Sequence, residues 1–248
     1  MRIIFFDTET TGGGEDDRLL QLAVKGRSSD TLGIHGGDVI INAIYKPPLP
    51  ISIDSMAVHH ITEKMVTGKP TFAEAEEYAD LKNIFEHTNT VAVAHNAAFD
   101  IAMLSREGIR PASTICTYKV ARALDADEKI GQYRLQYLRY LLQIEIDATA
   151  HDAMGDVLVL EALFERLLDT MKEQEGSEEA ALQRMIAISS EPVLFTTFRF
   201  GKYRGKRIEE VAQNDKGYLT WLLNEKRKDP AGEADWIHTL EQYLNARA

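Results

Sequence analysis

The 248-residue chain contains one cysteine, Cys116, so no disulfide can form within it. A lone thiol fits a reducing compartment, and we therefore expect a cytoplasmic protein. No run of about 18 apolar residues is present, which excludes a transmembrane helix of ordinary length. Asp7 interrupts the N-terminal apolar run and no small-residue cleavage site follows, so we expect no signal peptide.

The chain also lacks an excess of basic residues: its formal net charge is −11 at pH 7. A simple polyanion-binding protein would carry charge of the opposite sign. Residues 193–248 contain 10 Lys or Arg and 8 Asp or Glu, so this part is slightly basic. Residues 1–192 contain 18 Lys or Arg and 31 Asp or Glu, so this part is acidic. The acidic part would reach a phosphate backbone only through local basic groups or bound cations. A solvated acidic surface with no ligand is the alternative explanation.

Strand-like and helix-like segments alternate after an initial group of three strands. Short apolar or β-branched runs predict strands at 2–7, 19–25, 38–46, 91–94 and 114–117. Periodicity and end signals predict helices at 72–87, 98–107, 118–125, 133–142 and 152–172. This order predicts an α/β fold, in which a mixed β-sheet is flanked by helices.

The polar and acidic stretch from Lys172 to Ala181 predicts a boundary between domains. We expect a main domain over 1–173, a linker over 174–192 and a small C-terminal α+β segment over 193–248. A length of about 50 residues is marginal for independent folding, so we expect the C-terminal segment to pack on the main domain.

Two acids, Asp7 and Glu9, stand at the end of the first predicted strand. Side chains at positions i and i+2 point to the same face of a strand. Two adjacent carboxylates repel each other unless a cation or a proton lies between them. The pair therefore indicates a site with oxygen ligands for Mg²⁺ or Mn²⁺. A solvated strand end would show the same pattern.

Further polar groups follow later elements. Asp100 begins a predicted helix at the carboxyl end of a central strand, where clefts form in open α/β sheets. His151 and Asp156 lie at the start of the long predicted helix, and a histidine can accept a proton near neutral pH. Stabilisation by the helix dipole would explain Asp100 without any function, and loop hydrogen bonds would explain His95, Asn96 and His151.

Four segments share the order and spacing of the motifs of one enzyme family: Phe6–Gly12, Met56–Thr62, His95–Asp100 and His151–Asp156. On these residues the chain resembles the DEDDh branch of the DEDD exonuclease superfamily, which implies an RNase H-like fold. The resemblance extends over residues 1–172.

The C-terminal part extends the resemblance. Residues Thr196–Lys206 and Tyr218–Leu222 are similar to the C-terminal region of the exodeoxyribonuclease X family. The resemblance implies a 3′-to-5′ exonuclease, a phosphodiester hydrolase acting on DNA with a 3′ end, in DNA repair or end processing. An exoribonuclease, a polymerase proofreading subunit and a catalytically silent nucleic-acid-binding module remain alternatives. The protein partner of the C-terminal segment is unknown.

The resemblance also implies residue roles. Two divalent ions, Mg²⁺ or Mn²⁺, would be held by Asp7, Glu9, Asp100 and Asp156, and His151 would be the general base. Residues expected to frame the terminal nucleotide are Thr10, Thr11, His59, Ile61, Asn96 and Phe99. Cations that alternate with aromatic residues suggest nucleic-acid contact at Arg199, Lys202, Arg204 and Lys206. Turn chemistry and core packing are the alternatives for the first group, and protein docking is the alternative for the second.

Overall fold

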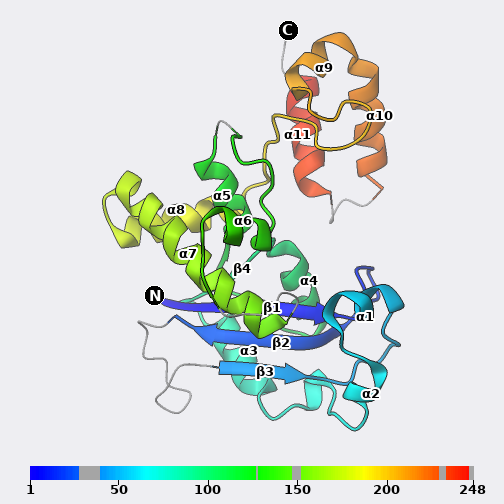
Figure 1. Ribbon diagram of the computed structural model, residues 1–248, viewed down its shortest axis with the longest axis vertical. Helices are drawn as coiled ribbons and strands as arrows, with labels where there is room; N and C mark the ends of the chain where they lie inside the picture. The colour runs from blue at the N-terminus through cyan, green and yellow to red at the C-terminus, as the bar shows by residue number, and fades with distance from the viewer. Residues whose placement is uncertain (28–39, 127, 147–151, 229–232, 246–248) are drawn as a thin grey trace. The chain divides into compact units, whose positions relative to one another are not determined.

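The computed structural model describes residues 1–27, 40–126, 128–146, 152–228 and 233–245 (Figure 1). The chain forms two compact units, Met1–Ser189 and Ser190–Ala248, called unit 1 and unit 2 below. His151, the expected general base, lies outside the described residues. Within the described ranges, no helix is both long and apolar enough to cross a lipid bilayer.

Unit 1 is built on a five-stranded sheet with the order β3-β2-β1-β4-β5. The strands are β1 (Arg2–Thr10), β2 (Leu19–Gly26), β3 (Ile40–Ile44), β4 (Thr90–Ala94) and β5 (Thr114–Cys116). The pairs β1–β2 and β2–β3 are antiparallel, whereas β1–β4 and β4–β5 are parallel. The predicted mixed sheet is therefore confirmed.

Successive residues of β1 belong to two separate hydrophobic cores. Ile3 and Phe5 are buried in one core, and Ile4 and Phe6 are buried in the other. This division follows from the two-residue period of a strand, which sends neighbouring side chains to opposite faces. The same period places Asp7 and Glu9 on the face of Phe5 and places Thr8 on the face of Phe6.

Helices cover both faces of the sheet (Figure 1). The face of Phe6 is covered by α3 (Tyr78–Glu86) and α4 (Ala98–Arg106). The face of Phe5 is covered by α5 (Thr117–Leu124), α6 (Leu135–Leu141), α7 (Ala153–Glu175) and α8 (Glu178–Ser190). The apolar stripe predicted on the long helix is buried in this second group, at Val157, Leu160, Phe164 and Leu167.

Some elements differ from the predictions. The expected helix over 72–87 is divided into a 3₁₀ turn, η1 (Phe72–Glu74), and α3. Two short helices were not predicted, α1 (Ile53–His59) and α2 (Glu63–Val66), because four to seven residues give little periodicity. The segment predicted as a linker contains α8, whose side chains Ala181, Leu182 and Met185 are buried in the core of unit 1.

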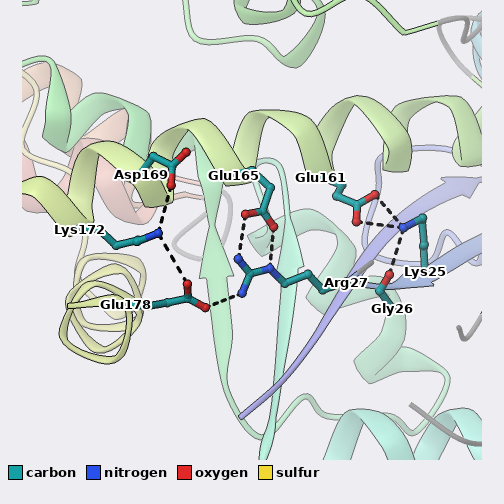
Figure 2. A network of polar contacts seen from close by, with 8 residues as sticks. All are labelled: Lys25, Gly26, Arg27, Glu161, Glu165, Asp169, Lys172 and Glu178. Carbon is teal, nitrogen blue, oxygen red and sulfur yellow. Dashed lines mark hydrogen bonds and ion pairs between the residues drawn. The ribbon is translucent and has the colours of Figure 1, made fainter. Parts of the chain in front are cut away.

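A polar network ties the end of β2 to α7 and α8 (Figure 2). Arg27 makes two hydrogen bonds to Glu165, of 2.6 and 2.8 Å, and a third of 2.6 Å to Glu178. Lys25 pairs with Glu161 at 2.8 Å. Acidic residues of the long helix are thus matched by cations at this end of the sheet.

Unit 2 consists mainly of three helices, α9 (Ile208–Asn214), α10 (Lys216–Lys226) and α11 (Ala234–Asn245). They enclose a core that includes Phe198, Leu219 and Leu240. Among the described residues of this unit, the only β-pairing is an isolated bridge between Thr197 and Arg207. The unit is therefore more helical than the predicted α+β segment, because aromatic residues of 195–203 pack on helices rather than extend a ladder.

Candidate active site

The carboxyl end of β1 carries Asp7 and Glu9 toward the face on which α7 packs. Burial raises the pKa of Asp7 well above its ordinary value, and the charges of Asp100, Asp156 and Glu9 raise it further. Burial, then repulsion from Asp156 and Asp100, raises the pKa of Glu9 to about 8. Four acids from three distant segments therefore repel one another within one site.

Asp100 lies in the first turn of α4 and is 5% exposed. The Thr8 backbone N–H donates to Asp100 Oδ1 at 3.1 Å, and the Thr8 hydroxyl donates to the same oxygen at 2.6 Å. Burial raises the pKa of Asp100 to about 7, although both hydrogen bonds from Thr8 oppose this change. Thr8 reaches Asp100 because it points to the face of the sheet opposite Asp7 and Glu9.

Asp156 lies in the first turn of α7 and is 9% exposed. The helix begins after Asp152, whose carboxylate accepts a hydrogen bond from the Gly155 N–H at 3.2 Å. Gln136 of α6 donates from Nε2 to Asp156 Oδ1 at 2.5 Å. The side-chain oxygen of Gln136, Oε1, in turn accepts from Arg139 Nη1 at 3.3 Å. The orientation of Asp156 therefore depends on α6 as well as on its own helix.

Thr8 and Gln136 were not among the residues predicted from the sequence. Strand alternation could have drawn attention to Thr8, since it stands between two acids and faces the other way. No pattern marks Gln136, because it reaches Asp156 from a separate helix 20 residues earlier in the chain.

The donor set fits a hard divalent cation in its chemistry. The side chains offer only carboxylate oxygens, which Mg²⁺ and Mn²⁺ prefer. Within the described part of the chain, no Lys or Arg forms an ion pair with Asp7, Glu9 or Asp100. However, no three His, Cys, Asp or Glu side chains among those residues form a ready metal-binding group. Thr8 donates to Oδ1 of Asp100 and Gln136 donates to Oδ1 of Asp156, so these two neutral donors orient the two carboxylates.

His95 has a structural environment. One ring nitrogen, Nδ1, lies 2.9 Å from Thr117 Oγ1, and the other, Nε2, lies 2.7 Å from the Tyr133 carbonyl oxygen. Burial lowers the pKa of His95 to about 4, so the ring is neutral near pH 7. The ring therefore joins the end of β4 to α5 and to the segment that precedes α6.

Four of the six residues expected to contact the nucleotide use their polar groups internally or are buried. The Thr10 hydroxyl donates to the Gly12 carbonyl at 2.7 Å, and the Thr11 hydroxyl donates to Asp17 Oδ1 at 2.7 Å. His59 accepts at Nδ1 from the Ile61 N–H, so its Nε2–H donates to the Thr10 carbonyl at 3.2 Å. Burial lowers the pKa of His59. The Ile61 side chain is buried in a small core with Leu20, Ile51 and Val66.

The other two residues of this group present surface beside Asp100. Asn96 is exposed and adopts a positive φ of 61° in the turn that follows β4. Phe99 is 37% exposed in the first turn of α4. These two side chains are therefore accessible to a ligand next to the carboxylates.

The basic residues predicted in unit 2 have different environments. Lys202 pairs with Asp215 at 3.0 Å and lies over the rings of Tyr203 and Tyr218. The Lys206 ammonium lies 3.6 Å from Glu210. Arg204 is exposed and forms no ion pair with any described residue, whereas Arg199 is partly buried.

Comparison with known protein families identifies both parts of the chain. The model of the Exonuclease family matches residues 4–164. The chain belongs to this exonuclease family. The model of the Exodeoxyribonuclease X-like C-terminal family matches residues 198–227, which lie in unit 2.

Individual relatives agree with this assignment. Exodeoxyribonuclease 10 of Escherichia coli K12 is 35% identical over 213 residues, which cover 79% of this chain and 88% of the relative. DNA polymerase III subunit epsilon of Treponema pallidum is 33% identical over 178 residues, covering 69% of this chain and 78% of the relative. A solved structure of exonuclease X in complex with 5′-overhanging duplex DNA superimposes with a TM-score of 0.56 and 28% identity, covering 75% of this chain and 99% of the other.

Proposed function

We propose that this exonuclease removes nucleotides from the 3′ end of DNA, and that two divalent ions, Mg²⁺ or Mn²⁺, are held by Asp7, Glu9, Asp100 and Asp156. The observation that carries the proposal is the gathering of these acids: Thr8, which stands between Asp7 and Glu9, donates two hydrogen bonds to Asp100, and burial, then repulsion from Asp156 and Asp100, raises the pKa of Glu9 to about 8. A cluster of buried carboxylates costs free energy that bound cations would offset. The name of the Escherichia coli relative supports DNA as the substrate.

The chain's own residues would divide the chemistry among them. When bound, divalent ions would acidify the attacking water and neutralise the charge that develops on the leaving 3′ oxygen. His151 would accept the proton of the water as general base. Thr8 would orient the carboxylate of Asp100, and Gln136 would orient that of Asp156.

The terminal nucleotide would lie against the exposed side chains of Asn96 and Phe99. Thr10 and Thr11 would contact the terminal nucleotide through their backbone groups, because their hydroxyls already have hydrogen-bond partners within the protein. His59 and Ile61 would act indirectly, since His59 donates to the Thr10 carbonyl and the Ile61 side chain is buried in a small core.

We also propose that residues 1–173 contain the catalytic domain and that residues 193–248 form an accessory domain that contacts the DNA backbone. The exposed guanidinium of Arg204 would make the main contact, with Lys206 beside it in sequence. Lys202 would contribute mainly to the fold of this domain, because Asp215 and two aromatic rings hold it.

A proofreading subunit of a DNA polymerase is the second candidate function. The similarity to the Treponema pallidum subunit epsilon favours it, and that match covers 69% of this chain. A proofreading subunit would bind a polymerase and would remove mismatched 3′ nucleotides faster than matched ones.

A panel of end-labelled DNA and RNA oligomers tests the proposal. Each oligomer is incubated with Mg²⁺, with Mn²⁺ or with a chelator, and released mononucleotides are counted. We expect release from DNA 3′ ends that needs one of the two metals and stops with the chelator. Equal release from RNA would contradict the preference for DNA, and release in the chelator would contradict the metal-dependent mechanism.

A further inference from the structure

Helix α6 exposes large apolar side chains beside the carboxylate site. Tyr140 is 73% exposed, Leu141 is 48% exposed and Tyr137 is 37% exposed. The opposite side of the same helix is anchored in the core through the buried Leu138. The helix is therefore fixed in place while its outer face remains available for contact.

The exposed face begins at the residue that holds Asp156. Gln136 bonds Asp156 at 2.5 Å, and Tyr140 follows Gln136 by four positions. Residues at i and i+4 lie on one face of a helix, about 5–6 Å apart at their Cβ atoms. Tyr140 therefore lies on the same face of the helix as Gln136, one helical turn farther along.

The surroundings of Tyr140 are those of a stacking platform. The Arg139 guanidinium carbon lies 5.5 Å from the centre of the Tyr140 ring, while the side chain remains largely exposed. Arg134, at the start of the helix, is exposed, and its guanidinium donates to the side-chain oxygen of Gln132 at 2.6 and 3.0 Å. A nearby positive charge and an open aromatic ring together match an unpaired base with its phosphate.

We propose that Tyr140 stacks on an unpaired base of the DNA strand, close to the 3′ end from which the nucleotide is released. The inference rests on the proposed function, because it takes DNA as the substrate and the carboxylates as the point of cleavage. A base bound here keeps the strand next to Asp156 while each successive nucleotide is removed. Stacking on an aromatic ring is tolerant of sequence, so all four bases would bind.

The test pairs changes in the protein with changes in the DNA. Full-length wild-type protein and the variant Tyr140→Ala are titrated against a fluorescein-labelled single-stranded decamer in chelator, and binding is followed by anisotropy. A set of decamers carries one abasic position each, moved step by step from the 3′ end. We expect Tyr140→Ala to weaken binding of the intact decamer roughly tenfold.

The decisive result is an energetic coupling between the Tyr140→Ala substitution and a single abasic position in the DNA. One abasic substitution near the 3′ end should weaken binding by wild type roughly tenfold and have little effect in Tyr140→Ala, because the stacking pair is already lost. Tyr140→Phe should retain the sensitivity to that abasic position, since it keeps the ring. Leu141→Ala, a truncation of a neighbouring exposed apolar side chain, should bind like wild type.

Several outcomes would overturn the inference. Unchanged binding by Tyr140→Ala, absence of binding by wild type, or equal sensitivity of both proteins to every abasic position would each reject stacking at Tyr140. Loss of binding to a protein partner, with DNA binding intact, would assign the face to that partner. Failure of the proposed function has a separate sign: wild type would bind the decamer and yet release no nucleotide with Mg²⁺ or Mn²⁺.

Discussion

Acidic residues of α7 have opposite environments at the two ends of the sheet in unit 1. Near the start of α7, Asp156 faces a site occupied by Asp7, Glu9 and Asp100. One to three turns farther along, Glu161 and Glu165 face Lys25 and Arg27 (Figure 2). Paired acids stabilise the fold, whereas the clustered acids oppose it and form the proposed metal site. Charge pairing thus separates stability from function along one helix.

The largest effect should follow a change that relieves the repulsion. Replacing Asp7→Asn removes one buried charge and one proposed metal ligand, so metal-dependent nucleotide release should fall roughly a thousandfold or more. The melting temperature of the metal-free protein at pH 8 should rise, because burial and then repulsion from the neighbouring acids disfavour an ionised aspartate at this position, and asparagine carries no charge. Release assays and thermal denaturation measure the two effects. Activity close to wild type would show that the site has been misassigned.

The pH dependence of stability should also distinguish the two ends. The pKa values of Glu9 and Asp100 are raised to about 8 and about 7, above the values of about 4 expected in the unfolded chain. Between about pH 4 and about pH 8 the folded state therefore binds more protons than the unfolded chain does. The stability of the metal-free protein should fall as the pH rises through this range. Added Mg²⁺ or Mn²⁺ should raise the melting temperature more at pH 8 than at pH 5. Equal metal effects at both pH values would argue against the carboxylates as ligands.

Substitutions at the end of the sheet where acids are paired with cations should lower stability without lowering nucleotide release. Arg27→Ala removes three charged hydrogen bonds from a side chain that is 13% exposed, so the free energy of unfolding should fall by about 2 kcal/mol. Nucleotide release well below the melting temperature should be unchanged. Lys82→Ala breaks the more exposed pair with Glu86 and should cost about 0.5 kcal/mol or less. Urea denaturation compares the free energies of unfolding of the two variants. Equal losses would show that the Arg27 network stabilises the fold no more than an exposed ion pair does.

A neutral donor at the acidic end gives a more limited test. Thr8→Val keeps the shape of the side chain and removes the hydroxyl that donates to Asp100 at 2.6 Å. We expect roughly a tenfold loss of nucleotide release and a higher metal concentration at half-maximal activity. Thr8→Ser should restore both values, because it restores the hydroxyl. A purely structural role would lower the melting temperature of Thr8→Val and leave the metal dependence unchanged.

The smallest effect concerns unit 2. The double variant Arg204→Ala, Lys206→Ala should weaken DNA binding and flatten its dependence on salt, by about one unit of slope for each phosphate that the variant no longer neutralises. Filter binding or anisotropy at several salt concentrations gives the slope. An unchanged slope would favour a protein-docking role for this unit.

The sequence predicted the sheet well because its strands have short, buried, β-branched runs, and β1 and β4 show almost complete burial. The four acids of the proposed site could be singled out from the sequence because they lie within recognisable local motifs, and their role as metal ligands stays a prediction. The sequence did not predict what holds these acids, since the partner of Asp156 comes from another helix and that of Asp100 depends on the strand face of Thr8. Short helices such as α1 and α2 depend on capping and tertiary packing more than on periodicity.

The division of β1 between two cores limits how this strand can change. A deletion or insertion of one residue before Asp7 would turn both acids toward the α4 side and turn Thr8 toward α7. The same slip would bring Ile4 and Phe6 into the space of Ile3 and Phe5, so both cores would have to repack together. Changes in length within this strand should therefore be tolerated only in steps of two residues.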